Sequence, residues 1–138
     1  MFTVRKILYA TDFSSYSNQA YFHAIALAEH HGANLTIVNV WTPNADCGDA
    51  QGCRTQLETI RPSNPRIAVQ HVFLEGDPAS ELVRYATEAG MDLIVMGTHG
   101  RTSVDRLLMG SVAEKVLRDA PCSVLVIKLP KGPKADRP

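Results

Sequence analysis

Three glycines and a serine in the C-terminal half of the chain have a spacing that could bind phosphate. Gly97 and Gly100 are followed, after nine intervening residues, by the pair Gly110 and Ser111. A glycine allows a positive φ, or lets a ligand approach the backbone without a Cβ in the way, so backbone N–H groups can face inward. Such donors, together with a serine hydroxyl, suit phosphate oxygens. The spacing therefore predicts a phosphate-binding loop.

The residues on either side of this loop have the patterns of a strand and a helix. Leu93 to Met96 are four consecutive apolar residues, which is typical of a strand buried on both faces. Ser111 to Glu114 have the sequence of a capping box, which predicts a helix start whose dipole favours an anion. The apolar residues that follow fall on one helical face: Ala113, Val116, Leu117 and Ala120. A strand before and a helix after favour phosphate binding over the alternative that the glycines only shape two tight turns.

This arrangement resembles the universal stress protein family, specifically its ATP-binding branch. The signature of that branch is G-x-x-G, nine residues, G-[S/T], and the spacing here matches it completely. The resemblance extends to ILYATDFS, from Ile7 to Ser14, and to GSVAEKVLRDAPCSVLVI, from Gly110 to Ile127. The segment from Thr42 to Pro65 departs from the family, which usually has a longer and more regular helix there. Only Cys53 and Leu57, with Ile60, suggest a helical face in it.

The resemblance implies that the ligand is ATP, and it assigns residues to each part of the nucleotide. Adenine would lie beside the backbone near Val40, with Ala10, Thr11 and Asp12 on the base and ribose side and Met96 packed nearby. Asp12 has a competing role, as a cap for the helix that follows it. The triphosphate would run along Gly97, Thr98 and Gly100 to Gly110, Ser111 and Val112. Mg²⁺ would accompany it, held largely by phosphate and water because this ion keeps much of its hydration shell.

Motifs for rapid hydrolysis are absent from the sequence. It contains no G-x-x-x-x-G-K-[ST] loop, no G-x-G-x-x-G and no G-x-S-x-G elbow. His99 is a weak candidate for a general base. Arg101 and Arg106 could add positive charge near the γ-phosphate or could belong to a solvated loop. The sequence favours a regulatory ATP-binding protein with slow or no turnover. The alternatives are an ATPase or nucleotidyl-transferring enzyme of the same fold, and an interaction module whose glycine loop is a relic.

Composition argues against several other classes of protein. Fourteen basic and fourteen acidic side chains cancel, so no overall field would hold nucleic acid or an anionic membrane. The length of 138 residues fits one domain, which we expect over residues 1–129, with a disordered tail at residues 130–138. Met1 to Lys6 contain no apolar run long enough for a signal peptide, which predicts a cytoplasmic protein.

The order of the expected elements predicts an α/β fold. Strands are expected at Ile7–Ala10, Leu35–Val40, Ile67–Leu74, Leu93–Met96 and Val124–Ile127, and helices at Tyr16–His30, between Asp77 and Gly90, and after Gly110. Their alternation implies an open parallel sheet with helices on both faces, and the resemblance implies the strand order 3-2-1-4-5 of a Rossmann-like domain. In such a sheet ligands bind outside the carboxyl ends of the strands. Asp12, Val40 and Gly97 all lie at such ends.

The last expected strand bears on how copies of the chain could associate. If Val124–Ile127 ends the sheet, its edge would be unpaired, and a homodimer formed through this strand would cover it. Proteins of the resembled family commonly dimerise in this way.

Cys47 and Cys53 could pair if their segment folds back, although an intracellular protein normally keeps such thiols reduced. Cys122 is expected to be a small core residue.

Overall fold

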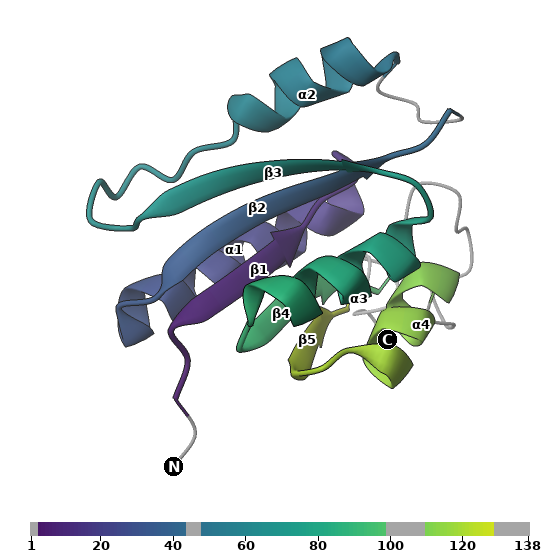
Figure 1. Ribbon diagram of the computed structural model, residues 1–138. Helices are drawn as coiled ribbons and strands as arrows, with labels where there is room; N and C mark the ends of the chain where they lie inside the picture. Colours follow the sequence, from purple (N-terminus) through teal and green to yellow (C-terminus); the bar gives the residue numbers. More distant parts are fainter. Residues whose placement is uncertain (1–2, 44–47, 99–109, 129–138) are drawn as a thin grey trace, which may run out of the picture.

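The computed structural model describes residues 3–43, 48–98 and 110–128. Within them, five parallel strands alternate with four helices (Figure 1). The elements are β1 (Lys6–Ala10), α1 (Ser15–His31), β2 (Asn34–Trp41), α2 (Ala50–Glu58), β3 (Val69–Glu75), α3 (Pro78–Ala89), β4 (Leu93–Gly97), α4 (Ser111–Asp119) and β5 (Ser123–Ile127). The strand order β3-β2-β1-β4-β5 confirms the predicted Rossmann-like sheet.

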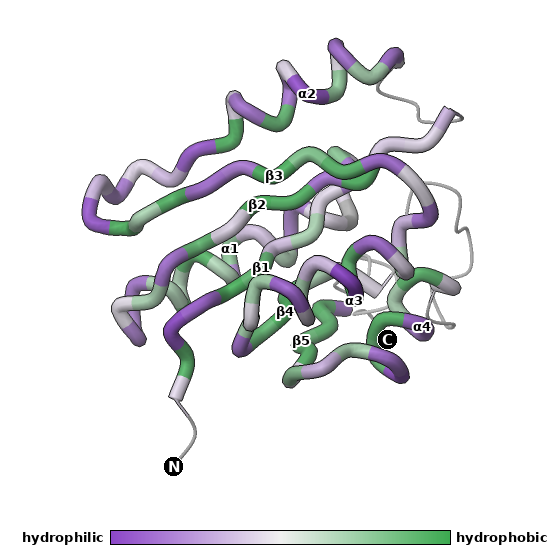
Figure 2. Tube along the Cα trace, in the orientation of Figure 1, coloured by the Kyte–Doolittle hydropathy of each residue, from purple (hydrophilic) through white to green (hydrophobic). Residues whose placement is uncertain are grey.

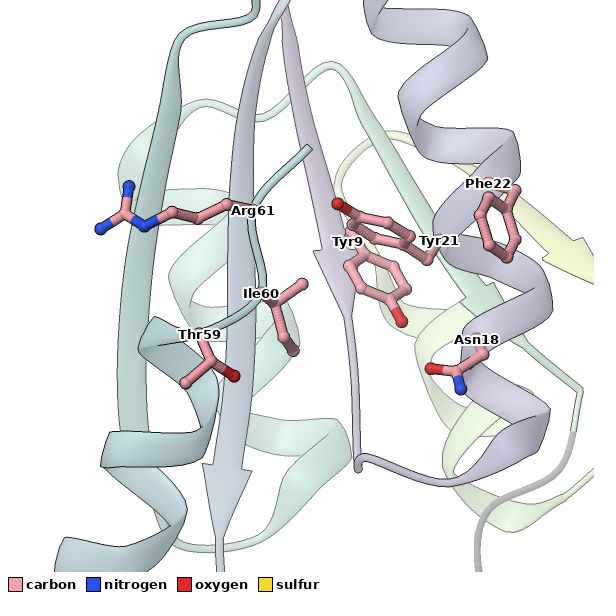
Figure 3. Close-up of a pocket in the computed structure, with 7 residues that line it drawn as sticks. All are labelled: Tyr9, Asn18, Tyr21, Phe22, Thr59, Ile60 and Arg61. Carbon is pink, nitrogen blue, oxygen red and sulfur yellow. The ribbon is translucent and has the colours of Figure 1, made fainter. Parts of the chain in front are cut away.

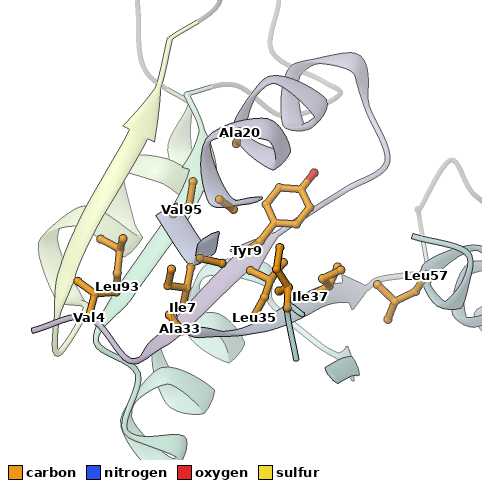
Figure 4. Packing of buried hydrophobic residues seen from close by; sticks show 13 residues of the cluster. Val4, Ile7, Tyr9, Ala20, Ala33, Leu35, Ile37, Leu57, Leu93 and Val95 are labelled. Atoms are coloured by element: carbon orange, nitrogen blue, oxygen red, sulfur yellow. The ribbon is translucent and has the colours of Figure 1, made fainter. Parts of the chain in front are cut away.

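The sheet separates two hydrophobic cores. On one face, α1 and α2 pack against the strands through small or apolar residues such as Ala20, Ala24 and Leu57. On the other face, α3 and α4 cover a second cluster that includes Leu82 and Val116. Figure 4 shows the first core, and Figure 2 shows that apolar residues gather along the strands, whereas α2 is largely hydrophilic. Two covered faces explain why the central strands are continuously apolar.

Capping residues fix the helix ends that the sequence predicts. Ser14 caps α1, and Gly32 ends it in the left-handed conformation with φ of 64°. Asp77 caps α3 through the Ser80 N–H, Pro78 occupies its first turn, and Gly90 ends it with φ of 68°. These positions need a side-chain acceptor at the start and a positive φ at the end, so they were predictable from residue type.

The helix α2 is more regular than its sequence suggested. Asp49 accepts a hydrogen bond from the Gly52 N–H at 2.8 Å and so begins the helix. Cys53 and Leu57 are its buried residues, as the helical spacing indicated. Cys53 is disulfide-bonded, and Cys47 lies outside the described residues. Cys122 is a free, half-buried thiol whose pKa is raised, chiefly by burial.

Several expectations concern residues that the structure does not describe. His99, Gly100, Arg101 and Arg106 are among them, and so is the predicted tail at residues 130–138. Their roles stay predictions. Within the described ranges, no helix combines the length and the hydropathy that a membrane span needs.

Candidate functional site

The described residues of the predicted site lie at or next to the carboxyl edge of the sheet. β1 ends at Ala10, β4 ends at Gly97 and β2 extends to Trp41, so the segments that follow β1 and β4 leave the sheet at the same edge. Ala10 and Val40 are half-buried, and Met96 is only 6 % exposed in the core beneath α3 and α4. The described candidates thus meet where an open parallel sheet binds ligands.

The two ends of the glycine loop are joined by a backbone hydrogen bond. The Gly110 N–H donates to the Thr98 carbonyl at 2.6 Å, and the Thr98 N–H donates to the Ile127 carbonyl of β5 at 3.1 Å. Thr98 is 9 % exposed. Residues twelve positions apart in sequence are therefore held together at the end of β4, beside the start of α4.

The start of α4 differs from the predicted capping box. Gly110, and not Ser111, is the N-cap residue, and as a glycine it has no side chain with which to cap the helix. Ser111 is instead its first residue, exposed at the helix entrance. The N–H groups of the first turn therefore receive no side-chain acceptor from their N-cap residue, and they carry the positive end of the helix dipole. This geometry is better suited to an external anion than the predicted capping box would have been.

The two described glycines of the loop do not adopt the positive φ that the sequence analysis considered for them. Gly110 has φ of −67°, and neither Gly97 nor Gly110 is among the described glycines with positive φ. Any residue could adopt the Gly110 backbone. What glycine contributes there is the absence of a Cβ and of a competing cap at the helix entrance.

The turn between β1 and α1 is held by side-chain hydrogen bonds. Asp12 Oδ1 accepts from the Ser14 N–H at 3.0 Å and from the Ser14 hydroxyl. Thr11 Oγ1 accepts from the Phe13 N–H at 3.0 Å. Phe13 has φ of 66°, the one positive value among the described non-glycine residues. A phenylalanine in this conformation is strained, which is a feature of functional turns more often than of structural ones.

A buried polar network supports this turn from below. The Tyr9 hydroxyl donates to the Ser17 carbonyl at 2.8 Å, and the Thr11 and Ser17 hydroxyls lie 3.1 Å apart. Burial is the main cause that raises the pKa of Tyr9 above its usual value. The phenol is therefore neutral at physiological pH, and the network positions Thr11 without adding charge to the site.

The end of β2 offers a backbone N–H and a carbonyl that bond to no described backbone group of the β1 side. Even-numbered residues of β2 bond toward β1, since the Asn34 N–H donates to Arg5 and the Val38 carbonyl accepts from Thr11. By the same alternation, the Val40 N–H and carbonyl face the β1 side. The last paired residues of β1 and β2 are Ala10 and Val38, so Val40 lies beyond the end of β1. One donor and one acceptor thus face the open end of the sheet.

A hollow on the α1 and α2 face contains none of the predicted site residues. Its volume is about 310 Å³, and its lining is Tyr9, Asn18, Tyr21, Phe22, Thr59, Ile60 and Arg61 (Figure 3). The guanidinium of Arg61 points away from the aromatic rings of Tyr9 and Tyr21. The hollow therefore lacks a directed charge that would select a phosphorylated ligand.

Two residues that the sequence analysis did not single out belong to this region. Phe13 adopts the strained conformation described above, and Asn39 donates from Nδ2 to the Thr11 carbonyl at 2.9 Å. Asn39 is 4 % exposed, and its Oδ1 has no hydrogen-bond partner in the part of the chain that the structure describes. The asparagine inside β2 was the signal that could have identified it, because asparagine is depleted in strands.

Comparison with known proteins gives one consistent result. The Universal stress protein family profile matches residues 3–128. A universal stress protein of Methanocaldococcus jannaschii is 36% identical over 142 residues, covering 92% of this chain and 84% of that protein. The universal stress protein UspA structure from Lactobacillus plantarum has a TM-score of 0.76 at 26% identity, covering 91% of this chain and 99% of the other. A universal stress protein from Archaeoglobus fulgidus, solved in complex with dAMP, has a TM-score of 0.66 at 23% identity. The match covers 93% of this chain and 100% of the other.

Proposed function

We propose that this chain, which belongs to the universal stress protein family, is a regulatory protein that binds ATP and hydrolyses it slowly or not at all. One observation carries the proposal. The start of α4, whose N-cap residue has no side chain, lies at the same edge of the sheet as a donor and an acceptor of β2 that no described backbone group of the β1 side uses. The groups of β2 can bind a base, and the start of α4 can bind a chain of phosphates.

The adenine end of the ligand is assigned to Val40. Adenine presents a donor, its amino group, next to an acceptor, its ring N1, and the Val40 carbonyl and N–H are complementary to that pair. Ala10, Thr11 and Asp12 would line the base and ribose side, with Met96 packed nearby. The dAMP complex of the Archaeoglobus fulgidus protein supports the choice of an adenine nucleotide.

The phosphate end is assigned to the glycine loop and to α4. The N–H groups of Ser111 and Val112 and the Ser111 hydroxyl would donate to phosphate oxygens. Gly97, Thr98, Gly100 and Gly110 would let the chain of phosphates approach the backbone. We also propose that Mg²⁺ accompanies ATP, bound mostly by phosphate and water, with Asp12 reaching it only through water.

Slow or absent hydrolysis is supported by the state of Asp12. Its carboxylate accepts two hydrogen bonds from Ser14, and these hold it in the turn before α1, whose N-cap residue is Ser14 and not Asp12. A carboxylate engaged in this way is a poor general base. A weak ATPase is the alternative. Steady turnover that Asp12→Ala abolishes, with ATP binding retained, would favour the enzyme.

A homodimer through β5 is part of the proposal. β5 is an edge strand, and its Val124, Leu125, Val126 and Ile127 are half-buried rather than buried. Pairing with β5 of a second copy would satisfy the outward backbone groups and cover these side chains. A cytoplasmic location stays a prediction.

Two measurements test the function. Protein purified without added nucleotide is denatured, and the supernatant is searched for released nucleotide by mass spectrometry. Nucleotide-free protein is then titrated with ATP and Mg²⁺ in a calorimeter, with GTP as the comparison for the base. We expect saturable heat with ATP and weaker binding of GTP. An empty supernatant together with no heat from ATP would show that the proposal is wrong.

A further inference from the structure

We infer that the Asn39 side chain ends the hydrogen-bond ladder between β1 and β2 one bond early, and so keeps the Val40 N–H available for the base of a bound nucleotide. The inference rests on the proposed ATP site and assigns a positioning role to a buried residue beside it. Asn39 acts through Thr11 and Val40 and does not itself touch the ligand.

The register of the two strands shows which bond is missing. The Thr11 N–H donates to the Val38 carbonyl at 2.9 Å, which continues the ladder one residue past Ala10. In a regular parallel ladder the Val40 N–H would next donate to the Thr11 carbonyl. No backbone hydrogen bond joins these two described groups. The Thr11 carbonyl instead accepts from Asn39 Nδ2 at 2.9 Å.

The chemistry of the contact fixes the orientation of the amide. A backbone carbonyl only accepts, so Asn39 must present its NH₂ group to Thr11, and its Oδ1 must point elsewhere. That oxygen is buried without a partner among the described residues. A buried acceptor left unpaired opposes folding, and an apolar residue of similar volume would avoid this cost. The favourable contribution of the Asn39 amide is therefore its contact with Thr11.

The consequence concerns the direction of one carbonyl. A carbonyl can accept two hydrogen bonds, but the Thr11 carbonyl accepts from Asn39 Nδ2 and not from the Val40 N–H, which faces the open end of the sheet. With an apolar side chain at position 39, nothing would direct the Thr11 carbonyl toward that side chain, and the Val40 N–H can extend the ladder to it. That N–H would then be lost as a donor to the acceptor nitrogen of adenine.

Amide hydrogen exchange tests this choice without any nucleotide. In the nucleotide-free wild-type protein, we expect the Val40 amide to exchange at least about tenfold faster than the laddered Val38 amide. In Asn39→Leu, which has a similar volume and no donor, the Val40 amide should slow to the rate of Val38. Equal protection of the two amides in the wild-type protein would overturn the inference, even if Asn39→Leu failed to fold.

Binding measurements test whether the freed N–H serves the base. We expect Asn39→Leu to bind ATP about tenfold more weakly, the effect of one lost hydrogen bond, and to bind inorganic tripolyphosphate as the wild type does. Equal losses for both ligands would overturn the inference, because they would indicate a general structural defect. Thr36→Val is the matched control, since Thr36 is a buried polar residue of the same strand at 5 % exposure, away from the end of β1. If the wild type binds neither ligand, the proposed function fails, whereas the exchange comparison still decides the role of Asn39.

Discussion

Gly110 and Thr98 are joined by a 2.6 Å hydrogen bond from the glycine N–H to the threonine carbonyl, at the point where β4 ends and α4 begins. This bond brings the uncapped helix entrance next to the carboxyl edge of the sheet. The same glycine leaves the first turn of α4 without a side-chain acceptor. A residue at position 110 that supplies its own acceptor would therefore compete with a phosphate for the same N–H groups.

Gly110→Asp should raise stability and abolish ATP binding. Its backbone, at φ −67° and ψ 158°, accepts a side chain without conformational strain. An aspartate there would cap α4, which relative to glycine stabilises by roughly 0.3 kcal/mol, and would repel the phosphates. Urea unfolding and calorimetry measure the two effects. Gly110→Ala is the control, because it adds a Cβ without an acceptor or a charge. A variant that is capped and still binds ATP normally would contradict the assignment of phosphate to this helix.

The contrast between Gly110 and Asp77 shows what the sequence could and could not predict. Asp77, followed by Pro78, predicts a helix start by residue type alone, and the structure confirms this start. Ser111 and Glu114 have the spacing of a capping box, yet Gly110 is the cap. The start of α4 is set by the bond from Gly110 to Thr98, a contact across the loop that local sequence does not encode.

The candidate site also has some features that the sequence could predict and others that it could not. Strand ends were predictable because apolar runs stop there, which located Asp12, Val40 and Gly97 at one edge. The role of Asn39 depends on the register between two strands, and the strain at Phe13 depends on how the chain turns into α1. Both are tertiary relationships, so the sequence shows at most an unusual residue type at position 39 and not what that residue does.

Asp77→Ala should destabilise the protein by about 1 kcal/mol at neutral pH, because it removes the acceptor for the Ser80 N–H. The pKa of Asp77 is lowered from 3.8, chiefly by that backbone hydrogen bond. A lowered folded-state pKa means that the ionised form stabilises the protein above pH 3.8 and that this stability is lost as pH falls through the folded-state value. Urea unfolding of both proteins at neutral pH and at pH 2 should show the difference shrinking.

Asp77→Asn separates the charge from the cap in the same experiment. Asparagine is an equally good N-cap residue and does not titrate. Its stability relative to Asp77→Ala should therefore not change with pH. If the aspartate and asparagine proteins lose stability equally between the two pH values, the titration of Asp77 is not the cause.

Val126→Pro should convert the proposed dimer to a monomer. The Ile127 carbonyl bonds to Thr98, so odd-numbered residues of β5 face β4, and the Val126 N–H faces the free edge. Proline at 126 removes an outward donor and leaves the bonds to β4 in place. Sedimentation equilibrium at micromolar concentration gives the mass. Leu125→Pro is the contrast, because it removes an N–H that faces β4 and should lower stability instead. A wild-type monomer would contradict the proposed dimer outright.

Phe13→Gly should be more stable than Phe13→Ala, the reverse of the usual order at a surface turn. Both variants lose the ring that packs against the first core, so the comparison isolates the backbone. At φ of 66° alanine keeps the strain of the left-handed region, about 1 kcal/mol, whereas glycine adopts it freely. The larger entropy of glycine in the unfolded state offsets part of this gain, which leaves a difference of about 0.5 kcal/mol. Urea unfolding of the two variants measures it. If alanine were the more stable, the turn must relax to a negative φ once the ring is removed, and the strain would then belong to the phenylalanine side chain rather than to the β1–α1 connection.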